Sequence, residues 1–219
     1  MAVGSAEDAD LPWLDQLAAD LAPVRPLDDG PARWQLAGLV GAAAVLVALA
    51  LGLRTDLVAG QPDLMFLLRC GSLAVLALVC TLAALDHAHP GVGRSSDGWK
   101  VAILMAGLLP LAGLAQAVMQ PDHAIAMAAQ PSGWQCLMVS LGIASLAALP
   151  IIRHLRRGAP VAPERAGLLV GLSAGSLGAL AYNVHCPFNS LAYIGLWYGS
   201  AVAIATVAGR LIVPRLVRW

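Results

Sequence analysis

Residues 34–53 read WQLAGLVGAAAVLVALALGL and contain no charged side chain. A helix of about 20 apolar residues is long enough to cross the roughly 30 Å hydrocarbon core of a bilayer, so this stretch predicts a transmembrane helix. Five further apolar runs of similar length follow it. They cover residues 64–85, 101–119, 134–152, 166–184 and 191–212. Because backbone groups in lipid must be satisfied within each segment, we expect an all-α polytopic membrane protein, a bundle of six transmembrane helices.

The composition of the chain agrees with this expectation and divides it into two parts. Of its 219 residues, 59% are hydrophobic and only 12% are charged, whereas soluble domains carry about 25% charged residues. The formal net charge is zero, but residues 1–33 hold seven acidic and two basic side chains, a net charge of −5. We therefore predict an acidic tail over 1–33 and a membrane domain over 34–219.

The basic residues predict the orientation, because Lys and Arg in short loops are retained on the cytoplasmic side. Eleven of them lie in the tail, after the second and fourth predicted spans or near the C-terminal end. The other two are Arg54 and Arg69, and we interpret Arg69 as reaching from the second span to the membrane interface. Both termini are thus predicted to be cytoplasmic, with the connections 54–63, 120–133 and 185–190 outside. Since the bases are explained by topology, no direct nucleic-acid contact is predicted.

Three glycines recur every fourth residue in the fifth predicted span: Gly167, Gly171 and Gly175. Such a spacing lines up a smooth face that allows close helix contact. The face is expected to pack against a neighbouring helix of the same chain, and a homodimer through these glycines is the alternative.

Four cysteines are present, and the predicted topology separates them. Cys70 and Cys80 fall within the second span and are interpreted as packing residues. Cys136 lies near the outer start of the fourth span, and Cys186 lies in the last outer connection. Because the fourth span begins and the fifth ends at the same outer surface, the fold can bring Cys136 and Cys186 together on the oxidising side. They are candidates for sensing, with a structural disulfide or two inert apolar side chains as the alternatives.

Two histidines belong to the same predicted surface and suggest a metal site. Thiolates and imidazoles together suit thiophilic metal ions. The candidate ligands are Cys136, Cys186, His185 and His123.

The acidic tail contains a short amphipathic helix pattern that ends at Pro23. A helix of about ten residues is marginal alone in water, so its apolar stripe needs a surface to lie on. Its acidic polar face disfavours anionic lipid and favours a protein partner, while folding back on the basic inner loops of the same chain is the alternative. The candidate partner-binding residues are Trp13, Leu14, Asp15, Leu17, Asp20 and Leu21.

Several stretches, in order, resemble the NrsF family of six-span bacterial membrane anti-sigma factors. They are LDQLAADLAPVRPL (14–27), GLRTDL (52–57), GWQCL (133–137), ERAGLLVGLSAG (164–175), AYNVHCPFNS (181–190), LWYGS (196–200) and VPRLVRW (213–219). The most specific elements are the HCP sequence, the WY pair that follows it and the final PRLVRW.

The resemblance implies an anti-sigma factor rather than an enzyme. Such a protein holds an extracytoplasmic-function sigma factor at the bacterial inner membrane and releases it under metal or oxidative stress. Two periplasmic cysteines are required, and Cys136 and Cys186 match them by position. No permanent cofactor is implied, only a transient thiophilic metal ion. The family commonly has acidic residues after the CP dipeptide, where this chain has Phe188 and Asn189.

Two other functions were weighed on the residues alone. A membrane thiol oxidoreductase that passes electrons to a quinone generally needs a closely spaced reactive cysteine pair, and this chain has none. A small transporter usually carries charged residues within its spans, and here the span interiors are almost uncharged. A plain scaffold protein is a further alternative.

Overall fold

The computed structural model describes residues 19, 27–89, 98–158 and 160–217. These residues form helices and connecting segments and contain no strand, which confirms the predicted all-α fold. The helices are α2 (Gly30–Leu51), α3 (Thr55–Val58), α4 (Leu64–Asp86), α5 (Gly98–Met119), α6 (Pro121–Ala128), α7 (Ser132–Arg157), α8 (Pro163–Tyr182), α9 (Leu191–Tyr193), the π-helical segment η1 (Ile194–Tyr198) and α10 (Gly199–Val217). The predicted tail helix, with Trp13, Leu14, Asp15, Leu17, Asp20 and Leu21, lies outside the described residues.

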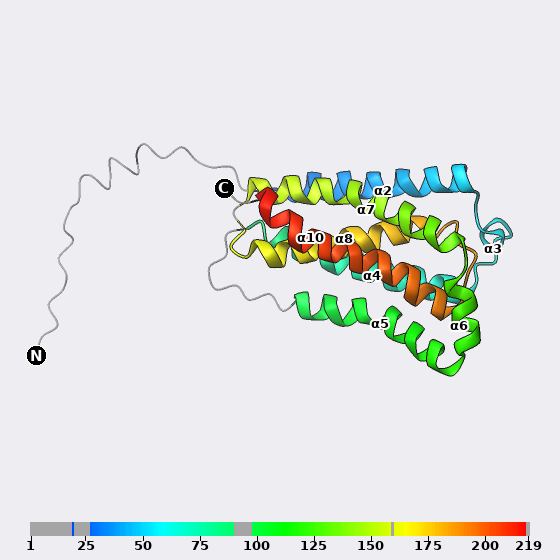
Figure 1. The fold of residues 1–219 in the computed structure, drawn as a ribbon. Coiled ribbons are helices and arrows are strands. Elements are labelled where there is room, and N and C mark those ends of the chain that lie inside the picture. Colours follow the sequence, from blue (N-terminus) through cyan, green and yellow to red (C-terminus); the bar gives the residue numbers. More distant parts are fainter. Residues whose placement is uncertain (1–18, 20–26, 90–97, 159, 218–219) are drawn as a thin grey trace, which may run out of the picture.

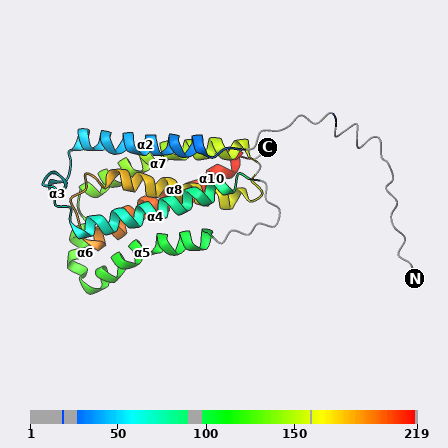
Figure 2. The same cartoon turned by 180° about the vertical axis from the view of Figure 1, so that it is seen from behind.

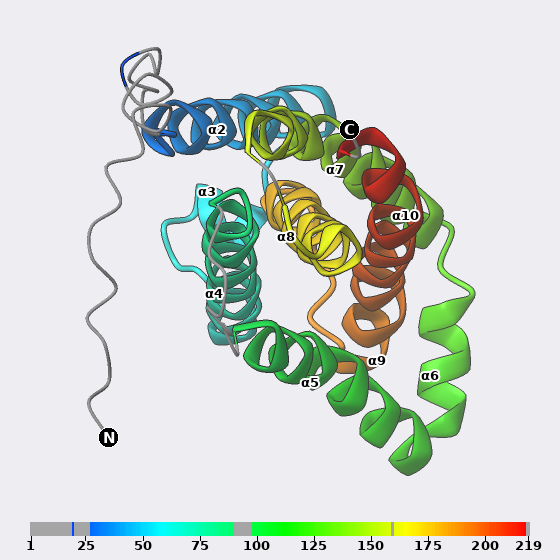
Figure 3. The same cartoon turned by 90° about the vertical axis from the view of Figure 1, so that its left-hand side faces the viewer.

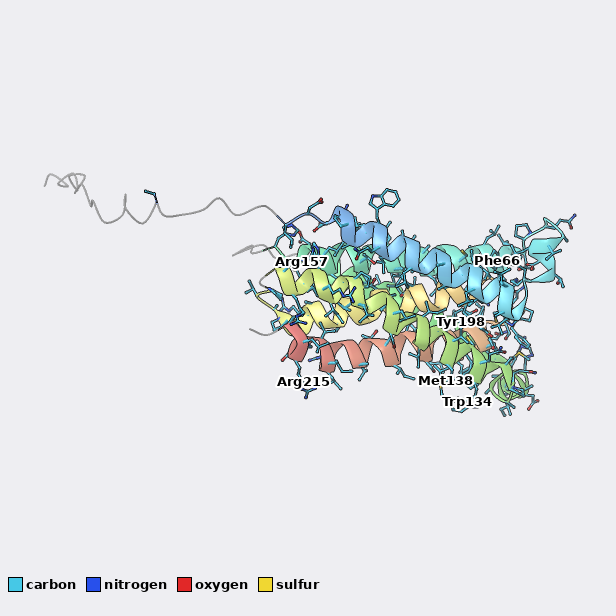
Figure 4. The ribbon with its side chains drawn as sticks, turned by 90° about the horizontal axis from the view of Figure 1, so that it is seen from above. Phe66, Trp134, Met138, Arg157, Tyr198 and Arg215 are labelled. Atoms are coloured by element: carbon cyan, nitrogen blue, oxygen red, sulfur yellow. The ribbon has the colours of Figure 1, made fainter. Side chains whose placement is uncertain are left out.

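The long helices run side by side and give the bundle two distinct ends (Figures 1 and 2). At one end, here called the tail end, α2 begins and α7 and α10 finish. The opposite end, here called the thiol end, carries the short helices α3 and α6. Arg157 and Arg215 lie toward the tail end, whereas Phe66 and Trp134 lie toward the thiol end (Figure 4).

Five helices are long and apolar enough to cross a membrane: Gly30–Leu51, Leu64–Asp86, Lys100–Met119, Ser132–Arg157 and the continuous stretch Leu191–Val217. They correspond to five of the predicted spans. The run predicted over 166–184 also forms a helix, α8, but α8 is not among these five. The five apolar helices indicate a membrane protein. The number of crossings and the orientation stay predictions.

Helix α8 lies in the middle of the bundle, with α2, α4, α5, α7 and α10 around it (Figure 3). Its most extensive contacts are with α10, followed by α7 and α4. Most of its residues are buried, including the serines Ser173 and Ser176. The core of the fold is therefore built around α8.

The glycine face of α8 is what allows α10 to approach so closely. A Cβ atom added to Gly167 would lie 2.6 Å from the carbonyl oxygen of Gly209, and one added to Gly171 would lie 2.4 Å from that of Ala205. One added to Gly175 would lie 2.9 Å from the Cα of Val202. The expectation of packing within the chain is confirmed. The alternative of a homodimer through these glycines is wrong for this fold, because α10 already occupies their face.

Candidate functional site

The two cysteines singled out from the sequence meet at the thiol end. Cys136 lies in the second turn of α7, and Cys186 lies in the connection between α8 and α9. Both side chains are buried in the same core cluster, both are free thiols, and they are near enough to interact electrostatically. The structure thus brings together two residues that are fifty positions apart. The other two cysteines lie on a different helix, α4. Cys80 is buried and Cys70 is half-buried.

Two buried arginines hold the backbone of the Cys186 connection, and together they are called the arginine clamp below. Arg54 and Arg69 are only 4% and 2% exposed. Arg54 donates through Nη1 to the carbonyl oxygen of Cys186, and Arg69 donates through Nη2 to the same oxygen at 3.4 Å. Arg69 also donates to the carbonyl oxygen of Phe188 at 2.7 Å. The clamp therefore fixes the main chain on both sides of Pro187.

The position of Arg69 corrects the sequence interpretation. Rather than reaching to an interface, its guanidinium turns into the bundle and stacks over the ring of Tyr198, 5.0 Å from the ring centroid. A cation over an aromatic face is attracted by the ring quadrupole, and the attraction grows when water is excluded. The charge of Arg69 was a sequence signal for a buried partner, because an arginine inside an apolar span more often contacts other protein groups than lipid.

Arg54 is neutralised by a carboxylate from the helix that it precedes. Its Nε and Nη2 atoms donate to the two carboxylate oxygens of Asp56, each at 2.9 Å, and its guanidinium lies 5.0 Å from the ring centroid of Phe66. The hydrogen bonds from Arg54 hold the pKa of Asp56 well below its usual range, helped by a further bond from the backbone of Asp63. The charge that Arg54 brings to the clamp is thus balanced locally.

Aromatic rings surround the thiols. The ring of Phe188 stacks on that of Tyr193 with centroids 4.6 Å apart, and Tyr182 faces Tyr198 at 6.4 Å. Trp197 contacts the start of α7 so closely that a Cβ atom on Gly133 would lie 2.0 Å from its indole ring. The GWQC and WY sequence elements therefore form one packed contact between α7 and the π-helical segment.

Comparison with known proteins assigns the chain to a family. The family model described as NrsF, negative regulator of sigma F, matches residues 17–219. The chain belongs to the NrsF family. It is 32% identical over 213 residues to the anti-sigma-F factor NrsF of Caulobacter vibrioides, covering 94% of this chain and 97% of that protein. It is 28% identical over 192 residues to the probable anti-sigma-F factor NrsF of Azospira oryzae, covering 85% and 89%. No solved structure matches it significantly.

The two residues at which this NrsF family member departs from the expected pattern both serve the Cys186 connection. Asn189 accepts a hydrogen bond from Nη2 of Arg54 through its side-chain oxygen at 3.2 Å. The carbonyl oxygen of Phe188 accepts a hydrogen bond from Arg69, and the ring of Phe188 stacks on that of Tyr193. Here a side-chain amide and a backbone carbonyl oxygen accept hydrogen bonds from the arginine clamp at positions where acidic residues were expected.

The predicted metal site of Cys136, Cys186, His185 and His123 is not formed. His185 donates through Nδ1 to the carbonyl oxygen of Gly52 at 2.9 Å. His123, on α6, pairs through Nε2 with the hydroxyl of Ser190 at 3.0 Å. Across residues 27–89, 98–158 and 160–217, no group of three or more His, Cys, Asp or Glu side chains is placed to hold a metal ion. In this structure each imidazole contacts a connecting segment instead, so metal binding by these four residues stays a prediction.

A second polar group, which sequence reasoning missed, lies at the tail end and is called the Asp29 joint below. Asp29 precedes the first turn of α2, and its carboxylate lies 2.9 Å from Nε2 of His154 near the end of α7. Nε2 of His89 is 3.8 Å from the same oxygen, and Arg33 contacts the other oxygen at 3.2 Å. The joint fastens the chain that enters the bundle from the tail to the far end of the helix that carries Cys136.

Proposed function

We propose that this NrsF family member binds an extracytoplasmic-function sigma factor through its N-terminal tail at the cytoplasmic face of a bacterial inner membrane. It releases that factor when Cys136 and Cys186 are oxidised or take up a thiophilic metal ion. The observation that carries the proposal is the family match over residues 17–219, which includes the second half of the acidic tail and the whole helical bundle. The two relatives with the same span are an anti-sigma-F factor and a probable one.

The thiol pair supports a sensing role at the end of the bundle away from the tail. Both thiols are free and both are buried in the core. A disulfide fixes the two Cβ atoms about 3.5–4.5 Å apart, so its formation would lock α7 and the Cys186 connection into one relative position. The arginine clamp holds that connection against α4, and a pull on Cys186 is therefore opposed by buried hydrogen bonds.

Helix α7 supplies the route by which such a pull reaches the tail. It carries Cys136 near its first turn and His154 near its last. These residues are 18 positions apart, which corresponds to about 27 Å along a helix axis. Since His154 contacts Asp29 and Asp29 immediately precedes α2, a shift of α7 along its axis bears directly on the point where the tail enters the bundle.

The test of the proposal is co-purification of the cognate sigma factor with the full chain from bacterial membranes. One arm carries the intact tail, one lacks residues 1–31, and one carries Cys136→Ser with Cys186→Ser. A matched control carries Cys70→Ser with Cys80→Ser. We expect the factor to bind all chains with a tail and to be lost after cadmium or hydrogen peroxide, except in the Cys136 and Cys186 variant. Failure of the intact tail to bind any sigma factor would refute the proposal.

The route through α7 has its own test. His154→Ala removes the contact with Asp29, and His87→Ala removes a histidine that contacts only the Ala83 carbonyl oxygen of its own helix. We expect His154→Ala to weaken the stress-induced release of the sigma factor while Cys136 and Cys186 still react. Unchanged release of the sigma factor in His154→Ala, or an equal loss of release in His87→Ala, would show that the Asp29 joint does not transmit the change from the thiol pair to the tail.

A further inference from the structure

A pocket opens beside Cys186 at the thiol end. It lies between the end of α2, the start of α7 and the Cys186 connection, and its volume is about 270 Å³. Its walls include Arg54, Thr55, Ser132, His185, Cys186 and Tyr193, and the pocket is called the Cys186 pocket below. Cys136 is not one of the residues that line it. Of the two thiols, only Cys186 therefore forms part of this wall.

Two hydroxyl groups in the pocket wall face each other. Tyr193 is fully buried, and its hydroxyl faces the buried Oγ atom of Ser132; neither atom has any other hydrogen-bond partner among the described residues. A hydroxyl group can both donate and accept a hydrogen bond, so this facing pair keeps free hydrogen-bonding capacity for a water or another small polar molecule in the pocket. Ser132 also precedes Cys136 by one helical turn on the same face of α7, which puts the second thiol behind the pocket wall.

The charged groups around the pocket indicate which kind of molecule it can bind. Arg54 contributes a permanent positive charge, and its guanidinium is already engaged by Asp56, Asn189 and the Cys186 carbonyl oxygen. His185 has its Nδ1 atom bound to the Gly52 carbonyl oxygen. An anion entering here would lose its water shell without gaining a free cation, which is costly. A small uncharged molecule with hydroxyl groups matches the two hydroxyls instead.

We propose that the Cys186 pocket admits small uncharged hydroperoxides, so that Cys186 is oxidised first and Cys136 resolves the product. This inference rests on the proposed sensing role of the two thiols. In the first step the sulfur of Cys186 attacks one peroxide oxygen, an S–O bond forms, and the O–O bond breaks. The sulfur is oxidised by two electrons to a sulfenic acid, the peroxide is reduced, and the thiol proton leaves with the departing oxygen as water or alcohol.

The second step joins the two sulfurs. The thiol of Cys136 attacks the sulfur of the Cys186 sulfenic acid, the S–OH bond breaks, and a disulfide and one molecule of water are formed. No further oxidant is required. Because Cys136 lies behind the wall, its own direct reaction with peroxide is slow, and the order of the two steps is set by access.

The test measures which thiol forms a sulfenic acid in the full chain in membranes. Cys136→Ala and Cys186→Ala variants are treated with hydrogen peroxide and dimedone, and the labelled peptides are quantified by mass spectrometry. We expect strong labelling of Cys186 in Cys136→Ala, and at least ten-fold less labelling of Cys136 in Cys186→Ala. Equal labelling, the reverse order, or no labelling of Cys186 would overturn the inference.

A second pair of variants tests the pocket as the route. Ser132→Leu fills the pocket from α7, and Ser145→Leu makes the same change at an exposed position of the same helix. We expect Ser132→Leu to slow peroxide labelling of Cys186 by at least ten-fold, with Ser145→Leu and total thiol content after denaturation unchanged. An unchanged rate in Ser132→Leu would refute the route.

These labelling results are independent of sigma-factor release. If Cys186 is labelled first but the sigma factor stays bound after disulfide formation, the order of attack stands and the proposed function fails. If release requires both thiols but Cys136 is labelled first, the proposed function stands and this inference fails.

Discussion

The two ends of the bundle hold their charged side chains in opposite ways. At the thiol end, Arg54 and Arg69 are buried and bind main-chain carbonyl oxygens of the Cys186 connection. At the tail end, one Asp29 oxygen pairs with half-exposed Arg33, while the other is buried against His154. Buried charges are costly when they lose a partner, whereas exposed pairs contribute about 0–1 kcal/mol. The thiol end is therefore held by buried contacts, whereas the tail end combines an exposed ion pair with one buried contact and is expected to shift at lower cost.

The largest expected effect comes from breaking the arginine clamp. Arg69→Ala removes a donor from the carbonyl oxygens of Cys186 and Phe188 and the cation from the ring of Tyr198. Arg54 still donates to the Cys186 oxygen, so only the Phe188 oxygen is left without a donor; together with the lost contact to Tyr198, we expect the free energy of unfolding to fall by about 2–3 kcal/mol. Unfolding of the purified protein in mild detergent by added SDS measures the change.

The matched control for the clamp is Arg210→Ala. Arg210 has a side chain 60% exposed and lies 3.9 Å from Glu164, so its removal is expected to change the free energy of unfolding by less than about 0.5 kcal/mol. Equal losses of unfolding free energy in the two variants would mean that buried Arg69 stabilises the fold no more than exposed Arg210 does.

The next effect tests how tightly the thiol end is packed. Gly133→Ala places a methyl group 2.0 Å from the ring of Trp197, so one of the two helices must move. Overpacking of this kind costs about 1–3 kcal/mol, and we expect a loss in that range. Gly142→Ala on the same helix is the control, because nothing lies within 4 Å of its added Cβ atom. If Gly133→Ala is as well tolerated as Gly142→Ala, the contact between α7 and Trp197 is loose.

A smaller effect is expected at the tail end. Asp29→Asn removes the charge that faces exposed Arg33 and buried His154, and we expect a loss of about 1 kcal/mol because the amide can still hydrogen-bond to His154. We expect little change in the unfolding midpoint but faster amide hydrogen exchange in the first turn of α2. Asp28→Asn, whose side chain contacts only the backbone of Gly30, is the comparison. A loss as large as that of Arg69→Ala would contradict the contrast between the two ends.

The smallest effect concerns pH at the thiol end. The pKa of Asp56 is lowered in the folded protein by its hydrogen bonds from Arg54, so its contribution to stability is present above the ordinary carboxyl range. That contribution is lost only as the pH falls below about 4 and toward the depressed folded-state pKa. We expect stability to be flat from pH 7 to 5 with respect to this group and to decline below pH 4. Asp56→Asn should flatten the decline, and an identical decline in the variant would assign it to other groups.

The helices were predictable because each apolar run is a long and independent signal. Five of the predicted spans agree with apolar helices to within five residues at each end, and the largest differences are at the ends of α7 and α10, which continue to Arg157 and Val217. The approach of Cys136 to Cys186 was predictable in outline from the topology. The arginine clamp and the Asp29 joint were not, since Arg69 contacts a residue 117 positions away and Asp29 one 125 positions away. A lone arginine in an apolar span has the same pattern whether it binds a carbonyl oxygen or reaches for water, and only the fold distinguishes the two.

Helix α8 has a consequence for how the protein is made. Its surface is covered by α10 and α7, and it is not itself among the helices apolar enough to cross a membrane. During synthesis, α8 emerges before the helix that fills its glycine face, because α10 is completed 35 residues after the end of α8. At about 5–20 residues per second, that interval lasts roughly 2–7 seconds. Until α10 is made, the glycine face of α8 has no covering helix, so we expect α8 to reach its buried position only when α10 is in place.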